Sequence, residues 1–177
     1  KGYESLDGVI DAESGYANGY GISPNYRSII QFKNKFNDNN FAEVVKVTFN
    51  SNAIETEDIL KHFFETHNPT QFNRQGNDVG TQYRSTILFV NENQKELAEE
   101  IMEEYQILLN DGGYGEIKTK LEPLDNFYPA EEYHQDYLKK NPNGYCPDLS
   151  TGIVFNNNDK SLLDNEILLT GKQILIL

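Results

Sequence analysis

Tryptophan is absent from this 177-residue chain, and cysteine and methionine occur once each. With Cys146 as its single cysteine, the chain cannot form an internal disulfide. No stretch approaches the roughly 18 consecutive apolar residues that a membrane-spanning helix needs, and the first residues do not have the pattern of a secretory signal. We therefore expect a cytoplasmic protein with no membrane association.

Basic residues are also scarce, since 15 Lys and Arg stand against 28 Asp and Glu, for a formal net charge of −13. Surfaces that bind nucleic acid need basic side chains to displace the counterions of phosphate groups. The charge balance therefore excludes nucleic acid and anionic membrane surfaces as partners. The remaining composition, 37% hydrophobic and 12% aromatic, is that of a globular chain large enough to bury a core.

Several common catalytic motifs are missing. The chain has no Gly-rich phosphate loop and no Gly-x-Ser-x-Gly elbow. His62 and His67 are five residues apart in a helical pattern and do not share a face. Glu131, Glu132 and His134 offer ligands at helical spacing but do not complete a zinc site. We predict no metal, and a metal-dependent hydrolase using His134 with Glu131 or Glu132 is kept as an alternative.

The hydrophobic pattern alternates between strand and helix. Val45, Val47 and Phe49 repeat at every second residue, as in a strand, whereas Ile59 and Phe63 have helical spacing. Strands are expected over residues 6–14, 43–49, 86–90 and 117–121, and helices over 57–67, 93–109 and 130–140. With the long aromatic and polar loops between them, these elements predict an α+β fold, a two-layer α/β sandwich with a ferredoxin-like mixed-sheet core.

A polar stretch at residues 73–85 lies between a predicted helix and a predicted strand. Residues suited to the positive φ of tight turns are spaced through it, namely Gly76, Asn77 and Gly80. Asp78 lies among them, and Tyr83 and Arg84 follow at the start of the strand. An acid, a phenol and a guanidinium on one tight loop predict a polar pocket. The alternative is a turn that only closes a helix–strand connection.

Cys146 is the only soft nucleophile in the sequence. It lies in a loop-like segment, residues 141–147, which contains two prolines and a glycine. An accessible thiol is at least as well supported by this context as a buried packing residue. No basic residue adjoins Cys146 to lower its pKa, so it is a poor candidate for the first nucleophile of a reaction.

At this point the motifs resemble a known family. Residues 76–85, Gly-Asn-Asp-Val-Gly-Thr-Gln-Tyr-Arg-Ser, are similar to the signature of class A peptide methionine sulfoxide reductases. Shorter matches follow the family's order at residues 7–9, 14–19, 25–26, 42–45, 68–70, 73–75, 127–135 and 141–146. Together they cover about residues 6–147.

The resemblance implies a mechanism for repairing oxidised methionine. In the family, a thiolate attacks the sulfur of the S epimer of methionine sulfoxide. The residue at the Glu43 position protonates the departing oxygen, and tyrosines at the Tyr26 and Tyr83 positions hydrogen-bond that oxygen. The residue at the Asp78 position supports the cavity, and His134 is expected to contact the substrate. A sulfoxide oxygen leaves poorly until it is protonated, so a neutral carboxylic acid is needed near pH 7.

The resemblance also implies the route of the electrons. The attack leaves a sulfenic acid, which a second cysteine converts to a disulfide. Cys146 is at the position of the resolving cysteine of one subgroup. Thioredoxin or a similar dithiol would then reduce the disulfide, so no cofactor is expected.

Two departures from the family pattern stand out. The Gly-Cys-Phe-Trp motif that carries the nucleophile belongs a short distance before Lys1 and is absent from this chain, in agreement with the missing tryptophan. In addition, Asn40 and Phe41 replace the usual Gly-His pair, and the loop between Tyr26 and Glu43 is longer than usual. We therefore expect a chain that lacks its catalytic nucleophile.

The remaining expectations concern alternatives and domain organisation. A relative that keeps the pocket without the chemistry would be a catalytically inactive module that binds methionine sulfoxide or another protein. Residues 1–147 are predicted to form the reductase-like domain, incomplete at its N-terminus. Residues 148–177 are predicted to be a tail or a linker, with a class B reductase as one candidate for a further domain.

Overall fold

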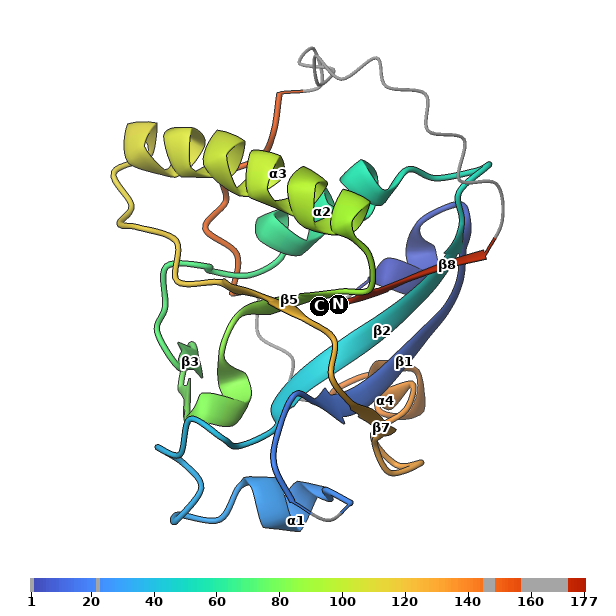
Figure 1. Ribbon diagram of the computed structural model, residues 1–177, viewed down its shortest axis with the longest axis vertical. Helices are drawn as coiled ribbons and strands as arrows, with labels where there is room; N and C mark the ends of the chain where they lie inside the picture. The colour runs from blue at the N-terminus through green and yellow to red at the C-terminus, as the bar shows by residue number, and fades with distance from the viewer. Residues whose placement is uncertain (1, 22, 145–148, 157–171) are drawn as a thin grey trace.

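The computed structural model describes residues 2–21, 23–144, 149–156 and 172–177 (Figure 1). Six strands form the main sheet: β1 (Val9–Ala17), β2 (Ala42–Asn50), β5 (Thr86–Phe89), β6 (Lys120–Pro123), β7 (Phe127–Pro129) and β8 (Lys172–Ile176). Their order is β6-β5-β8-β2-β1-β7. The pairing of β5 with β6 is parallel and the other pairings are antiparallel.

The helices are α1 (Tyr26–Ile29), α2 (Thr56–Glu65), α3 (Glu92–Asp111) and α4 (Tyr137–Lys140), with 3₁₀ turns η1 (Tyr3–Ser5) and η2 (Thr81–Tyr83). In Figure 1, α2 and α3 lie together over one face of the sheet. A mixed sheet with helices against it confirms the predicted α+β fold. Across the described residues, every helix is too short or too polar to cross a membrane.

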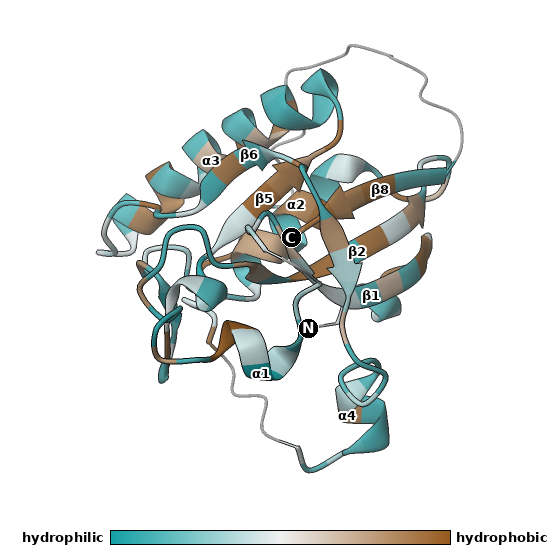
Figure 2. Ribbon diagram, turned by 60° about the horizontal axis from the view of Figure 1, so that its bottom comes forward, coloured by the Kyte–Doolittle hydropathy of each residue, from teal (hydrophilic) through white to brown (hydrophobic). Residues whose placement is uncertain are grey.

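The main core lies between the sheet and these two helices. Fully buried members come from both layers: Phe49 and Ile87 from strands, Phe64 from α2, and Ile101 and Tyr105 from α3. Figure 2 shows apolar colour along β5 and β8, while α3 carries mostly polar residues with apolar ones at intervals. The helical spacing seen in the sequence therefore corresponds to the buried stripe of each helix.

Helix boundaries differ from the predictions, most clearly at the start of α3 and in the segment before α4. The side chain of Asn91 accepts a hydrogen bond from the backbone N–H of Gln94 at 2.9 Å, so α3 begins earlier than the predicted Asn93 start. The helix expected over 130–140 is reduced to α4, because Asp136 takes a left-handed conformation with φ of 52° just before it. That conformation does not occur within a right-handed helix.

The last described segment has a place in the sheet that the sequence did not predict. β8 lies between β2 and β5, with Leu175 opposite Val47 and Ile176 opposite Leu88. Leu175 and Ile176 are fully buried, and Phe155 packs in the main core. The predicted boundary between residues 147 and 148 falls outside the described residues, so the division into domain and tail remains a prediction.

Candidate active site

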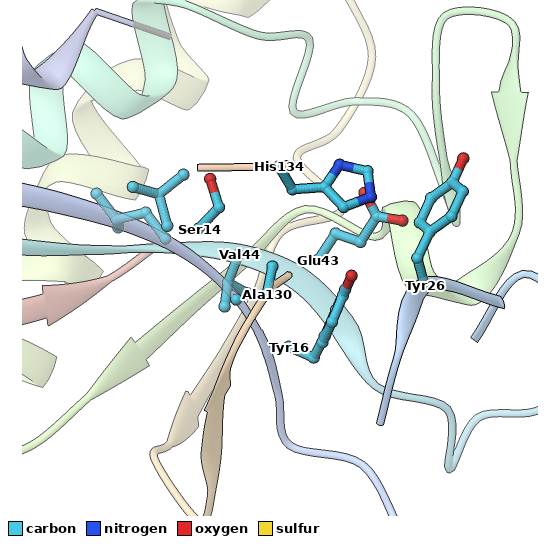
Figure 3. Close-up of a pocket in the computed structure, with 10 residues that line it drawn as sticks. Ser14, Tyr16, Tyr26, Glu43, Val44, Ala130 and His134 are labelled. Atoms are coloured by element: carbon cyan, nitrogen blue, oxygen red, sulfur yellow. The ribbon is translucent and has the colours of Figure 1, made fainter. Parts of the chain in front are cut away.

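A cavity of about 230 Å³ lies beside β1 and β2. Five polar residues line it: Ser14, Tyr16, Tyr26, Glu43 and His134. Figure 3 shows the Glu43 carboxyl and the rings of His134 and Tyr26 directed toward the same space, with the Tyr16 hydroxyl pointing the same way. The cavity is smaller than the roughly 300–1,000 Å³ of sites for drug-sized ligands, so it suits a group of side-chain size.

Glu43 reaches this cavity because of its place in β2. Alternation along the strand puts Glu43 on the same face as Val45 and Val47, and it is paired with Tyr16 of β1. Its Oε1 atom is buried and has no hydrogen-bond partner among the residues that the structure describes. Burial first, and then the charges of Asp78 and Glu131, raise the pKa of Glu43 to about 7. A carboxyl in this state still holds its proton near neutral pH and has an oxygen free for a ligand.

Two phenols face the same acid from different segments. Tyr26 opens α1, where the Asn25 side chain caps the helix. Burial and then Glu43 and Asp78 raise the pKa of Tyr26, and the hydroxyl of Tyr83 acts against this shift. Burial, then Glu43 and then Tyr26, raises the pKa of Tyr83. Both phenols therefore remain neutral hydrogen-bond donors at neutral pH, although Tyr83 is not among the residues that line the cavity.

Asp78 is held by a short hairpin of β3 (Arg74–Gln75) and β4 (Asp78–Val79), in which it pairs with Gln75. Gly76 begins the two-residue turn with φ of 58°, and Asn77 does not have a positive φ. A turn with positive φ at its first central residue alone favours glycine there. The charge of Asp78 acts on Glu43, Tyr26 and Tyr83. The structure therefore brings Asp78 into the same electrostatic environment as the predicted acid and phenols.

Arg84 has a different place from the one that the polar-loop hypothesis gave it. Its guanidinium is buried and donates to backbone carbonyls, with Nη1 2.9 Å from the oxygens of Asn40 and Thr81 and Nη2 3.2 Å from that of Asn18. It does not line the cavity. Arg84 therefore joins its own segment to the loops at Asn18 and Asn40, because their carbonyls and that of Thr81 converge on one rigid group of donors.

His134 completes one wall of the cavity. Its ring lies 4.7 Å, centre to centre, from that of Tyr26 and 4.4 Å from that of Tyr133. The Nε2 atom is buried without a hydrogen-bond partner. The predicted residues Tyr26, Glu43 and His134 thus meet in one cavity, and two of them present unpaired polar atoms.

Two residues of the site were missed as such from the sequence. Tyr16 lines the cavity and donates a hydrogen bond to Oε2 of Glu131 at 2.6 Å. The sequence predicts only the role of a metal ligand for Glu131, although both residues lie in segments that match the family pattern, 14–19 and 127–135. Those matches were a usable signal, whereas a single sequence does not reveal the strand register that places Tyr16 opposite Glu43.

A metal site finds no support in the described residues. Both carboxylate oxygens of Glu131 accept protein hydrogen bonds, from Tyr16 and from the backbone of Tyr26. The described ranges contain no group of three or more His, Cys, Asp or Glu side chains placed to hold an ion. Cys146, the predicted resolving cysteine, lies outside the described residues.

Comparison with known proteins decides the family. The model of the peptide methionine sulfoxide reductase family matches residues 1–162. The chain belongs to this family. The peptide methionine sulfoxide reductase MsrA of Corynebacterium kroppenstedtii is 44% identical over 154 residues, which are 84% of this chain and 68% of that protein. The human mitochondrial reductase is 44% identical over 148 residues, 84% of this chain and 61% of that protein.

Solved structures agree with the sequence comparison. Methionine sulfoxide reductase A of Corynebacterium diphtheriae gives a TM-score of 0.73 at 37% identity, covering 86% of this chain and 73% of that one. Reduced Mxr1 of Saccharomyces cerevisiae gives 0.71 at 34% identity, covering 84% and 80%. Against the Corynebacterium kroppenstedtii and human relatives, the chain spans 68% and 61% of the full length. The reductase fold is therefore shared, and the activity of this chain is a separate question.

Proposed function

We propose that the cavity binds the sulfoxide group of the S epimer of methionine sulfoxide and supplies the acid for its reduction to methionine. The observation that carries this proposal is that Glu43 lines the same cavity as Tyr26, with a pKa raised to about 7 and a buried Oε1 that has no hydrogen-bond partner among the described residues. A sulfoxide oxygen accepts hydrogen bonds and donates none, so it matches a pocket whose polar groups are donors. A proton held at Glu43 would turn the oxygen into a better leaving group.

The reaction also needs a thiol. In the complete reaction, a thiolate attacks the sulfoxide sulfur and forms an S–S bond while Glu43 gives its proton to the oxygen. The S–O bond and the new S–S bond then break as the hydroxyl group moves to the cysteine sulfur, which leaves a sulfenic acid, a thioether and the ionised Glu43. The sole cysteine of the sequence is Cys146, which we assign to the later step of disulfide formation. We therefore propose that this chain binds the sulfoxide but does not turn it over with its own cysteine.

Electrons would come from a dithiol. A disulfide that includes Cys146 and the attacking thiol would be reduced by thioredoxin or a similar protein through thiol–disulfide exchange. No other cofactor enters this scheme. Peptides and proteins that contain oxidised methionine are the proposed substrates.

A coupled assay tests the lack of turnover. The 177-residue chain is mixed with thioredoxin, thioredoxin reductase, NADPH and a peptide that contains the S sulfoxide. We expect NADPH consumption equal to that of a Cys146→Ser control. Consumption above the control would show that the chain has a working nucleophile and would overturn this part of the proposal.

A binding experiment tests the assignment of the cavity. Calorimetry with the two separated epimers of N-acetyl-methionine sulfoxide amide is expected to show binding of the S epimer and weaker binding of the R epimer. Tyr26→Phe removes a donor and should lower the affinity about 3–10-fold, in line with one hydrogen bond of about 1 kcal/mol. Equal binding of both epimers, or no binding of either, would count against the cavity as a sulfoxide site.

The inactive binding module is the second candidate, and it shares this site. The two candidates differ when a thiol is supplied, because only a pocket with working acid chemistry accelerates sulfoxide reduction by an external thiol. Binding without such acceleration, at any thiol concentration, would favour the module.

A further inference from the structure

Glu131 joins three separate segments around the cavity. It follows β7, and its Oε2 atom accepts a hydrogen bond from the Tyr16 hydroxyl of β1 at 2.6 Å. Its Oε1 atom accepts from the backbone N–H of Tyr26, the first residue of α1, at 2.8 Å. The neighbouring Ala130 N–H donates to the carbonyl of Ser14 at 2.9 Å and fixes the segment against β1. One carboxylate thus holds two of the residues that line the cavity.

The two hydrogen bonds favour the ionised form of Glu131. Burial by itself would raise its pKa, but the donors at Tyr16 and at the Tyr26 backbone outweigh burial and lower it. Glu131 therefore carries a negative charge over the whole range near neutral pH. Both oxygens are occupied, so this carboxylate has a structural partner at each end, unlike Glu43 with its free Oε1.

The fixed charge of Glu131 acts on Glu43. After burial and Asp78, Glu131 is the third cause that raises the pKa of Glu43. Two nearby carboxyls whose environments push their pKa values apart commonly divide the roles of acid and anion. In this pocket Glu43 keeps the proton and Glu131 keeps the charge.

The segment around Glu131 also positions Tyr26. Its ring packs against His134, three residues after Glu131 in the chain, and its backbone is held by Glu131 itself. The N–H of His134 also donates to the carbonyl of Glu131 at 2.8 Å. The positions of both rings thus depend on the same short segment.

From these contacts we propose that Glu131 is a positioning residue for sulfoxide reduction. It holds Tyr16 and Tyr26 on the cavity wall and sets a permanent negative charge opposite Glu43. It acts through these neighbours, because Glu131 itself is not among the residues that line the cavity. The role in reduction rests on the proposed function, whereas the effects on Glu43 and Tyr26 do not.

The adjacent residue offers a matched control. Glu132 is exposed and pairs with Lys140 at 2.9 Å, so Glu132→Gln removes the same charge one residue away without touching the cavity. Glu131→Gln keeps the size of the side chain and one acceptor oxygen. Comparing Glu131→Gln with Glu132→Gln therefore separates the loss of the anion at Glu131 from a general change of net charge.

The first measurement follows the Glu43 carboxyl by ¹³C NMR between pH 5 and pH 9, without any sulfoxide. In Glu131→Gln the ratio of protonated to ionised Glu43 at pH 7 is expected to fall about threefold or more, as one charge several ångströms away would produce. In Glu132→Gln the ratio should match that of the parent chain. Equal ratios in all three proteins would overturn the proposal.

The second measurement concerns the position of Tyr26. Glu131→Ala removes the acceptor of its backbone N–H, and hydrogen exchange of that amide is expected to accelerate at least about tenfold. Glu132→Ala should leave it unchanged, and an unchanged rate in Glu131→Ala would contradict the positioning role. If both effects appear but the parent chain does not bind S-sulfoxide in calorimetry, the proposed function fails while the placement of Glu131 stands.

Discussion

At the scale of single residues, the pocket depends on a difference between two carboxyl groups, those of Glu43 and Glu131. Glu131 is satisfied by two donors, whereas Glu43 has a buried oxygen without a partner. An unpaired buried polar atom costs free energy, so its presence in a cavity is better explained by a ligand than by stability. We therefore expect the affinity for a sulfoxide to depend on the protonation of Glu43.

Sulfoxide binding is expected to weaken as pH rises. Because the protonated form of Glu43 donates to the sulfoxide oxygen, affinity should be constant well below pH 7 and fall about tenfold per pH unit well above it. Glu43→Gln keeps an N–H donor and should remove this dependence. Calorimetry at pH 6, 7 and 8 measures it, and an affinity that stays constant in the parent chain would contradict the donor role.

The same group should make the folded state less stable in alkali. The folded-state pKa of Glu43 is raised from 4.5 to about 7, so the folded chain binds more protons than the unfolded chain between these values. The contribution of Glu43 to the free energy of unfolding therefore falls as pH rises through this window. Glu43→Gln should increase the free energy of unfolding at pH 8 by about 1–3 kcal/mol, as measured by urea denaturation, with Glu132→Gln as the control of unchanged stability.

At the scale of elements, a buried polar chain connects α2 to the sheet. His67, just after α2, contacts the carbonyl of Phe63 through Nδ1 at 2.6 Å and the Ser85 hydroxyl through Nε2 at 2.7 Å. Ser85 in turn lies 2.7 Å from the Thr119 hydroxyl. Burial lowers the pKa of His67 to about 4, against the opposing effect of the Phe63 carbonyl.

His67 should therefore destabilise the folded chain in mild acid. The unfolded chain takes up a proton on His67 below about pH 6.5, while the folded chain does so only near pH 4. The contribution of His67 to the free energy of unfolding is thus lost as pH falls through this window, by about 2 kcal/mol at pH 5 relative to pH 7, and it opposes the contribution of Glu43 over the same window. Urea denaturation of the parent chain and of His67→Gln at both pH values tests this: from pH 7 to pH 5, the free energy of unfolding of the variant should change by about 2 kcal/mol more in the stabilising direction than that of the parent chain. An identical change in the two proteins would contradict the role of His67.

The register of β8 places the end of this strand beside the cavity. Leu177 and Val45 exchange backbone hydrogen bonds of 2.7 and 3.0 Å, and both residues line the cavity. Part of the cavity wall therefore depends on a pairing between two strands that are far apart in the sequence.

At the scale of the whole molecule, the local sequence pattern predicts those elements whose structure depends on neighbouring residues. The strand around Val47, the helix around Phe63 and the polar loop around Asp78 follow from periodicity and turn chemistry, and the family resemblance supplied Tyr26 and Glu43. The features that the sequence does not predict depend on pairings between residues that are far apart in the chain. Tyr16 and Glu131 meet across 115 positions, and β8 belongs to the sheet only through its pairing with β2 and β5.

The position of Arg84 also depends on contacts between distant segments. An arginine beside a tyrosine on a polar loop suggested a pocket residue, but the carbonyls of Asn18 and Asn40 draw it away from the cavity. Those two asparagines are far from Arg84 in the chain, and their approach depends on how the loops fold over the sheet. Residue type predicted that a site existed; tertiary contacts decided which side chains belong to it.

The central claim is that Glu43 holds its proton for a sulfoxide oxygen. The most direct measurement is the ¹³C resonance of the Glu43 carboxyl at pH 7, recorded while the S or the R epimer of N-acetyl-methionine sulfoxide amide is added. We predict that the S epimer shifts the resonance toward the protonated form in a saturable manner and that the R epimer has little effect. A resonance that responds to neither epimer, or equally to both, would contradict the account.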